Sequence, residues 1–129
     1  MYEGYDAVKD ERFFRLLGGG VEFGETAAQA VRRELIEELG AELTNVEPLA
    51  IQENIFDFFG RPHHEIAFLF TAELVDPSFY ERDELGKVLD TDEEVSWQPL
   101  SRLFDPATTE PSPGTLPLYP RGLLALLRA

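Results

Sequence analysis

The stretch GGGVEFGETAAQAVRRELIEELGA, residues 18–41, carries most of the information about fold and chemistry in this chain. Three consecutive glycines, Gly18 to Gly20, interrupt regular structure, and a helical pattern follows them. Apolar residues recur in this pattern at steps of three and four, at Ala28, Val31, Leu35 and Leu39. The spacing predicts a helix over residues 26–39 with one apolar stripe, and Gly40 follows at the C-cap position.

The same helix carries three glutamates, Glu34, Glu37 and Glu38, within an arc of roughly 100°. Like charges at this spacing repel each other and weaken a bare helix. A hard divalent cation offsets that repulsion, because Mg²⁺ prefers oxygen ligands and completes its coordination with water and substrate phosphates. The glycines upstream allow close backbone approach, so the carbonyl of Gly18 or Gly19 is a candidate further ligand. A solvated acidic face remains the alternative interpretation.

Composition narrows the class of protein. The chain has 129 residues, with 11 basic and 25 acidic side chains and a net charge of −14. Its length and its hydrophobic fraction of 43% predict one folded domain over residues 1–129. The acidity argues against binding to a nucleic-acid backbone or an anionic membrane. The absence of cysteine excludes disulfides, thiolate metal sites and a cysteine nucleophile. No run approaches the roughly 20 apolar residues that span a bilayer, and no secretory signal is visible, so we expect a cytoplasmic protein.

Hydrophobic alternation predicts the other elements. Residues 2–5 and 13–17 flank a polar stretch and indicate a hairpin, and residues 47–56 indicate a strand. Residues 65–74 alternate more strongly and are apolar on both faces, which is typical of a strand covered on both sides in a layered α/β or α+β domain. The remaining expectations are a strand at 94–98, short helices at 100–104 and 121–128, and an irregular proline-rich connector at 106–120.

The stretch at residues 18–41 resembles the Nudix box of the Nudix hydrolases, G-x5-E-x7-R-E-U-x-E-E-x-G-U, in which U is a bulky aliphatic residue. The residues that fill this pattern in register are Gly19, Glu25, Arg33, Glu34, Leu35, Glu37, Glu38 and Gly40. The final aliphatic position holds Ala41, a small residue. The resemblance continues in QENIFDFFGRPHHEIAFLF (52–70), EVSWQPLSRLF (94–104) and LYPRGLLALL (118–127), so it covers most of the chain.

This resemblance implies the Nudix fold, a mixed β-sheet between α-helices in an α/β (α+β) domain, with the box as loop–helix–loop. One departure concerns the start of the chain. Nudix domains usually carry a further strand well before the box, whereas the box begins here at Gly19. We therefore expect the N-terminal strand to be short or missing, which affects stability, dimer contacts and part of the substrate pocket.

The resemblance also implies hydrolysis of a diphosphate linked to another moiety, often a nucleoside, with Mg²⁺ or Mn²⁺ as the cofactor. We expect Glu37 and Glu38 to be the primary metal ligands, and Glu34 to be a third ligand or the base that acts on water. The backbone carbonyl of Gly18 or Gly19 is the further ligand expected from the loop.

Two other groups are expected to support the box. Arg33 and Glu25 form its structural pair, an Arg–carboxylate bridge that holds the loop against the helix. A glutamate outside the box often serves as ligand or base in this family. The segment TDEEVSW offers Asp92, Glu93 and Glu94, of which Glu94 is favoured first and Glu93 second. A solvated acidic loop is the alternative interpretation of that segment.

Basic and aromatic residues are candidates for substrate contacts. Arg15 precedes the glycine loop and Arg61 lies in a predicted turn, so either is a candidate partner of a substrate phosphate. His63 and His64 are adjacent, and in an extended chain they point to opposite faces, which favours a polar pair over a shared metal site. Five aromatic residues are either core or a wall for base stacking: Phe13, Phe14, Phe56, Phe58 and Phe59.

Three functions remain open at this point. The first is an active Nudix pyrophosphohydrolase acting on a small nucleotide-type substrate, with no nucleic-acid polymer and no membrane as partner. The second is a Nudix-fold nucleotide-binding or regulatory module without turnover, although the box glutamates that such modules usually lose are all present. The third is an acidic metal-binding protein. The substrate and a homodimeric state are left open.

Overall fold

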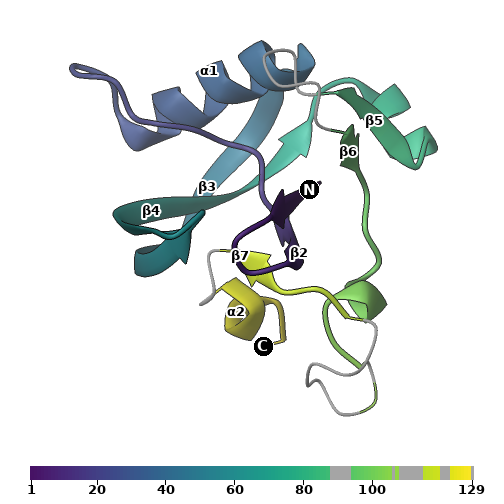
Figure 1. The fold of residues 1–129 in the computed structure, drawn as a ribbon. Helices are drawn as coiled ribbons and strands as arrows, with labels where there is room; N and C mark the ends of the chain where they lie inside the picture. The colour runs from purple at the N-terminus through teal and green to yellow at the C-terminus, as the bar shows by residue number, and fades with distance from the viewer. Residues whose placement is uncertain (88–93, 106, 108–114, 120–122, 129) are drawn as a thin grey trace.

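The computed structural model describes residues 1–87, 94–105, 107, 115–119 and 123–128 (Figure 1). Five strands form a mixed sheet in the order β5-β6-β1-β2-β7. Their bounds are β1 Tyr2–Asp6, β2 Glu11–Arg15, β5 Glu84–Lys87, β6 Glu94–Ser96 and β7 Leu118–Tyr119. The sheet is mixed because β2 pairs in parallel with β7, whereas the β1–β2 hairpin and the other pairs are antiparallel. The expected hairpin is confirmed, and its first strand is short, with five residues.

The two longest strands form a separate antiparallel ribbon, β3 (Leu43–Phe58) and β4 (Arg61–Leu74). Both were expected from the sequence, and both extend further toward the hairpin turn than the alternation indicated. In the register of the ribbon, Ile51 lies opposite Phe68 and Asn54 lies opposite Glu65. The turn is made by Phe59 and Gly60, both at positive φ.

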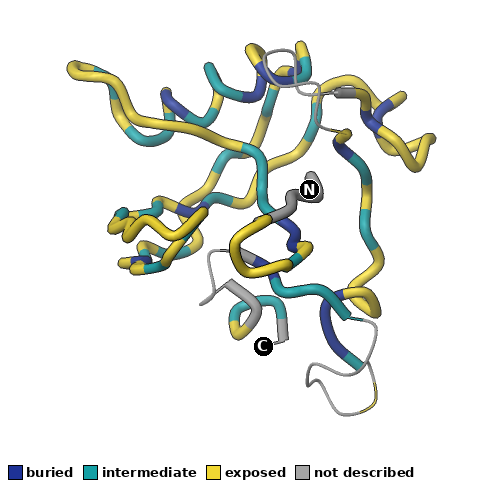
Figure 2. The backbone as a smooth tube through the Cα atoms, viewed as in Figure 1, coloured by how far each residue is buried: buried dark blue, intermediate teal, exposed yellow. Residues whose placement is uncertain are grey.

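The prediction that residues 65–74 are covered on both faces is wrong. Ile66 and Phe68 of β4 are 60% and 47% exposed, and Ile51 on the neighbouring strand is 68% exposed. Figure 2 shows the exposed residues along this ribbon. The physical reason is that β3 and β4 stand apart as a two-stranded ribbon, so that only the opposite face, which includes Leu69, packs into the core.

Helix α1 (Ala27–Leu39) ends where the sequence predicts and begins one residue later, with Thr26 as its N-cap. The Thr26 hydroxyl accepts a hydrogen bond from the Gln29 backbone at 3.1 Å, and the Thr26 backbone donates to the Gln29 side chain at 2.9 Å. This reciprocal capping box satisfies two amides that the first turn leaves without helical partners. Gly40 ends the helix at φ 66°, where its N–H donates to the Ile36 carbonyl. Glycine adopts this left-handed conformation without steric cost.

Two clusters of buried apolar side chains connect these elements. One joins the sheet to the ribbon, and its members are Phe14, Leu69, Leu103, Phe104 and Leu118. The other lies beneath the end of α1, and its members are Ala41, Phe79, Leu85 and Val95. Ala41, the small residue at the last position of the box, is fully buried in the second cluster.

The described residues of the second half of the chain include three short helices, η1 (Pro77–Glu81), η2 (Leu100–Arg102) and α2 (Leu123–Arg128). The strand expected at 94–98 is β6, and the helix expected at 100–104 is the single 3₁₀ turn η2 after Pro99. In Figure 1, α1 and α2 lie on opposite sides of the strands. Most of the proline-rich connector and residues 121–122 lie outside the described residues. Within the described residues, no helix is long and apolar enough to cross a membrane.

Candidate active site

Arg33 connects the helix to the loop in front of it. Its Nη2 and Nε atoms donate to the two carboxylate oxygens of Glu25 at 2.7 Å and 3.1 Å, and Nη2 also donates to the Gly20 carbonyl at 2.9 Å. This is the bridge that the resemblance implied between Glu25 and Arg33. The bonds from Arg33, followed by a bond from the Glu22 backbone, lower the pKa of Glu25. The same Glu25 contact raises the pKa of Arg33, so the guanidinium stays charged.

The remaining donor of Arg33 faces two of the box glutamates. Its Nη1 atom donates to Glu34 at 2.9 Å and to Glu37 at 3.1 Å. The side chain of Glu34 is 16% exposed and that of Glu37 is 50% exposed. Arg33 therefore supplies the positive charge that balances these two carboxylates, whose repulsion the sequence had indicated.

Gly19 touches the carboxylate of Glu34. A Cβ atom built on Gly19 would lie 2.4 Å from Glu34 Cδ, closer than any side chain tolerates. By contrast, a Cβ on Gly20 would meet nothing within 4 Å. A side chain at position 19 would therefore displace the Glu34 carboxylate, and the close approach places the loop backbone beside a box carboxylate.

The third box glutamate lies deeper. Glu38 is 8% exposed, and its Oε2 atom is shielded from solvent. Burial of a carboxylate is costly unless a positive charge or hydrogen-bond donors accompany it. In the part of the chain that the structure describes, no group of three or more Asp, Glu or His side chains is already placed to hold a metal ion.

A cavity of about 560 Å³ adjoins the glycine loop. We call it the loop cavity; residues 15–21 form one wall, Ala27, Ala30 and Val31 of α1 a second, and residues 65–70 of β4 a third. This volume falls in the range of about 300–1,000 Å³ that small-molecule sites occupy. Arg15 is among the lining residues, so the cavity combines a cation with the loop that contacts Glu34.

Other candidate residues lie elsewhere. Glu94 is exposed at the start of β6, and Arg61 is exposed at the start of β4; neither lines the loop cavity. His63 stacks on Phe56 with ring centroids 5.1 Å apart, and His64 contacts Glu53 at 2.8 Å, so the two rings occupy opposite faces as expected. Asp92 and Glu93 lie outside the described residues.

Sequence reasoning missed one polar pair beside this region. Asn54 is 7% exposed and donates from Nδ2 to Glu65 Oε1 at 3.2 Å, across the ribbon. The available signal was one polar residue in each of two strongly apolar strands. That these two residues face each other could not be recognised without the register of the ribbon.

The fold and the site define a class: a mixed α+β domain in which a glycine loop and a glutamate-bearing helix line a cavity of ligand size. The family model of the NUDIX domain matches residues 5–119. The chain therefore belongs to the Nudix hydrolase family. This membership supports a Nudix-type hydrolase in general, a small nucleotide-type substrate, and the divalent metal ions that the family generally uses.

Proposed function

We propose that this protein hydrolyses a diphosphate linkage in a nucleoside diphosphate derivative, with Mg²⁺ or Mn²⁺ as cofactor. The observation that carries the proposal is the loop cavity, because it brings the glycine loop, α1 and Arg15 around one ligand-sized space. A phosphate group in this space lies beside the loop that contacts Glu34.

The donor set suits a hard divalent cation. We propose Glu37 and Glu38 as primary ligands, Glu34 as a third ligand or as the base, and the carbonyl of Gly19 as a further ligand. All of these donors are oxygens, which Mg²⁺ prefers. The close approach of the loop at Gly19 to the Glu34 carboxylate supports a loop carbonyl as a neighbouring donor. When bound, such an ion neutralises the diphosphate and lowers the pKa of a bound water.

The residues of the chain itself position these groups. Arg33 binds Glu25 and the Gly20 carbonyl on one side and Glu34 and Glu37 on the other. Loop and helix are therefore held as one unit, which keeps the carboxylates oriented. Because Arg33 Nη1 serves both Glu34 and Glu37, a metal ion that takes these oxygens competes with the guanidinium for them.

Two residues are candidates for the base, and two others are candidates for the contact with the substrate phosphate. Glu34 is the favoured base because it touches the loop, and Glu94 is the second candidate from the segment outside the box. Arg15 is the favoured phosphate contact because it lines the loop cavity, whereas Arg61 lies at the far end of the ribbon. A charge-assisted bond from Arg15 to phosphate adds affinity as well as orientation.

A panel of nucleoside diphosphate and triphosphate derivatives tests the proposal. Release of phosphate and pyrophosphate would be measured with Mg²⁺, with Mn²⁺ and with EDTA. We expect metal-dependent release from a subset of the panel and none with EDTA. Absence of release from the whole panel, in folded protein with metal present, would overturn the hydrolase.

A Nudix-fold binding module without turnover is the second candidate. The observation in its favour is that the described carboxylates do not form a ready group of three around a metal. If the protein is such a module, it binds a nucleotide without releasing phosphate. A binding measurement made on the same panel of nucleotides detects this outcome.

A further inference from the structure

Two charged side chains line the loop cavity, Arg15 of β2 and Glu65 of β4. Every other described residue of its lining is apolar or a glycine. A few polar groups in a mostly apolar pocket fix the orientation of a ligand and supply its specificity. The proposed function uses Arg15 and leaves Glu65 without a role, so the question is which group of a ligand Glu65 contacts.

The carboxylate of Glu65 is held by a buried amide. Asn54 lies opposite Glu65 in the register of the ribbon, is 7% exposed, and donates from Nδ2 to Glu65 Oε1 at 3.2 Å. The second oxygen, Oε2, accepts no hydrogen bond from the described residues and is not shielded from solvent. Glu65 therefore presents one fixed, solvent-accessible carboxylate oxygen on the wall of the cavity.

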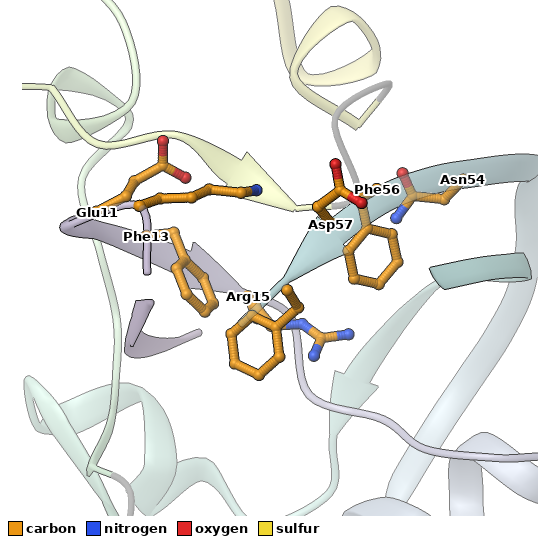
Figure 3. A pocket seen from close by; sticks show the side chains of 8 residues that line it. Glu11, Phe13, Arg15, Asn54, Phe56 and Asp57 are labelled. Carbon is orange, nitrogen blue, oxygen red and sulfur yellow. The ribbon is translucent and has the colours of Figure 1, made fainter. Parts of the chain in front are cut away.

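Arg15 lies in the same neighbourhood as this pair. Besides the loop cavity, it lines a small recess between β2 and β3 that Asn54 also lines, and Figure 3 shows both side chains there. The ion pairs among the described residues are formed by Arg33 and His64, and Arg15 takes part in none of them. Because Arg15 and Glu65 line one cavity without pairing with each other, a ligand can contact both.

The two charges select different groups of a ligand. A phosphate pairs with the guanidinium of Arg15 and is repelled by the carboxylate of Glu65. An ionised carboxylate only accepts hydrogen bonds, so the group beside Glu65 must be a donor. In a nucleoside diphosphate derivative, the donors closest to the phosphates are the hydroxyl groups of the sugar. A ligand whose phosphate lies at Arg15 therefore places its sugar toward Glu65.

We propose that Glu65 is a specificity-determining residue that accepts a hydrogen bond from a ribose hydroxyl, so that the loop cavity selects ribonucleotides over deoxyribonucleotides. Asn54 positions the carboxylate, and Arg15 holds the phosphate end. The assignment deepens the proposed function and rests on it for the class of ligand. A site that binds a hydroxyl rejects the analogue without it, because the charged acceptor then loses its donor within the cavity.

Three nucleoside monophosphates in EDTA test Glu65 without metal or turnover. Adenosine 5′-monophosphate is compared with its 2′-deoxy and 3′-deoxy analogues, so that base and phosphate stay constant and one hydroxyl is removed at a time. Dissociation constants would be measured by NMR titration of the full chain. We expect loss of one of the two hydroxyls to raise Kd about tenfold or more.

Variants assign that preference to Glu65. Glu65→Gln keeps the size of the side chain and an acceptor for Asn54 but removes the charge, so the ratio of Kd should fall to about threefold or less. Glu73→Gln is the matched control and should keep the wild-type ratio. Glu73 is also a glutamate of β4 that accepts from an asparagine of β3, Asn45 at 3.0 Å, and it does not line the loop cavity. If Glu65→Gln does not fold, Glu65→Asp replaces it: the shorter side chain withdraws the carboxylate, and the ratio should again fall.

The outcomes separate this proposal from the hydrolase. Equal Kd values for the three nucleotides, no detectable binding of any of them, or a preference that survives Glu65→Gln would overturn the role of Glu65. Metal-dependent release in the panel would keep the hydrolase in each of these cases. A hydroxyl preference that depends on Glu65, combined with a silent panel, supports the role of Glu65 and removes the hydrolase.

Discussion

The carboxylate of Glu25 accepts two hydrogen bonds from the guanidinium of Arg33, at 2.7 Å and 3.1 Å. This paired geometry is the strongest form of Arg–carboxylate contact. The bridge connects the loop to the helix, because Glu25 lies before α1 and Arg33 lies within α1. The same guanidinium reaches the Gly20 carbonyl and two box glutamates, so the bridge organises the site as well as the fold.

The bridge predicts a pH dependence of stability. Folding lowers the pKa of Glu25 below its ordinary value of 4.5, so its contribution is complete above that value and is lost as pH falls through the lowered pKa. We therefore expect Glu25→Gln to lower Tm at pH 7, and the difference from wild type to shrink below about pH 4.5.

Thermal unfolding of both proteins between pH 7 and pH 3 checks this expectation. Glu22→Gln is the matched control in the same loop, since Glu22 is 71% exposed and 3.8 Å from Arg33. Its effect on Tm should be small at every pH. A Glu25→Gln difference that stayed constant to pH 3 would contradict the account of the bridge.

Gly19 predicts an effect on catalysis. In Gly19→Ala the new Cβ collides with Glu34, so the carboxylate or the loop must shift, and we expect kcat to fall about 100-fold. Gly20→Ala, which meets nothing within 4 Å, should leave kcat nearly unchanged. Steady-state rates of the two variants are measured on the best substrate of the panel. Equal rates would contradict a contribution of the Gly19–Glu34 contact to catalysis.

Arg15 predicts an effect on substrate affinity. Loss of one charge-assisted bond to phosphate costs about 1.5–3 kcal/mol, so Arg15→Gln should raise KM roughly 10- to 100-fold. Arg61→Gln is the control with the same change of charge, at a position outside the loop cavity. We expect its KM to match that of wild type. If Arg61→Gln raised KM and Arg15→Gln did not, the phosphate would lie at the turn of the ribbon.

The strands, the helix and its stop at Gly40 could be predicted because each depends on local pattern. Alternation and three- and four-residue spacing report which face of an element is apolar, and this held for β3, β4 and α1. Whether another element packs on each face depends on the tertiary structure, which the pattern within one strand does not report. Ile66 and Phe68 therefore looked like core residues, although the separation of the ribbon from the sheet leaves them exposed.

The candidate site was predictable to a similar extent. The spacing of residues 19–41 was sufficient to match this segment to the Nudix box, including the Glu25–Arg33 pair. Two features depend on side-chain placement and could not be seen: Arg33 balancing Glu34 and Glu37, and the burial of Glu38. Asn54 was missed for a similar reason, because its importance arises only when β3 and β4 pair in register with Glu65 opposite.

The core predicts a difference between two phenylalanines. Phe14 is fully buried among residues of both the sheet and the ribbon, whereas Phe23 is fully exposed in the loop before α1. Phe14→Ala should lower the free energy of unfolding by about 3–5 kcal/mol. Phe23→Ala should change it by less than about 0.5 kcal/mol. Urea unfolding of both variants measures the two values, and similar losses would contradict the assignment of the core.

The central claim is that the box carboxylates support a metal-dependent hydrolysis, and Glu38→Gln tests it most directly. The substitution keeps the size of the side chain and removes its charge. We predict that turnover of the best substrate with saturating Mg²⁺ falls by about 100-fold or more, while Glu42→Gln, an exposed neighbour, keeps its rate. Wild-type turnover in folded Glu38→Gln protein would contradict the account, because the buried carboxylate would then have no part in the reaction.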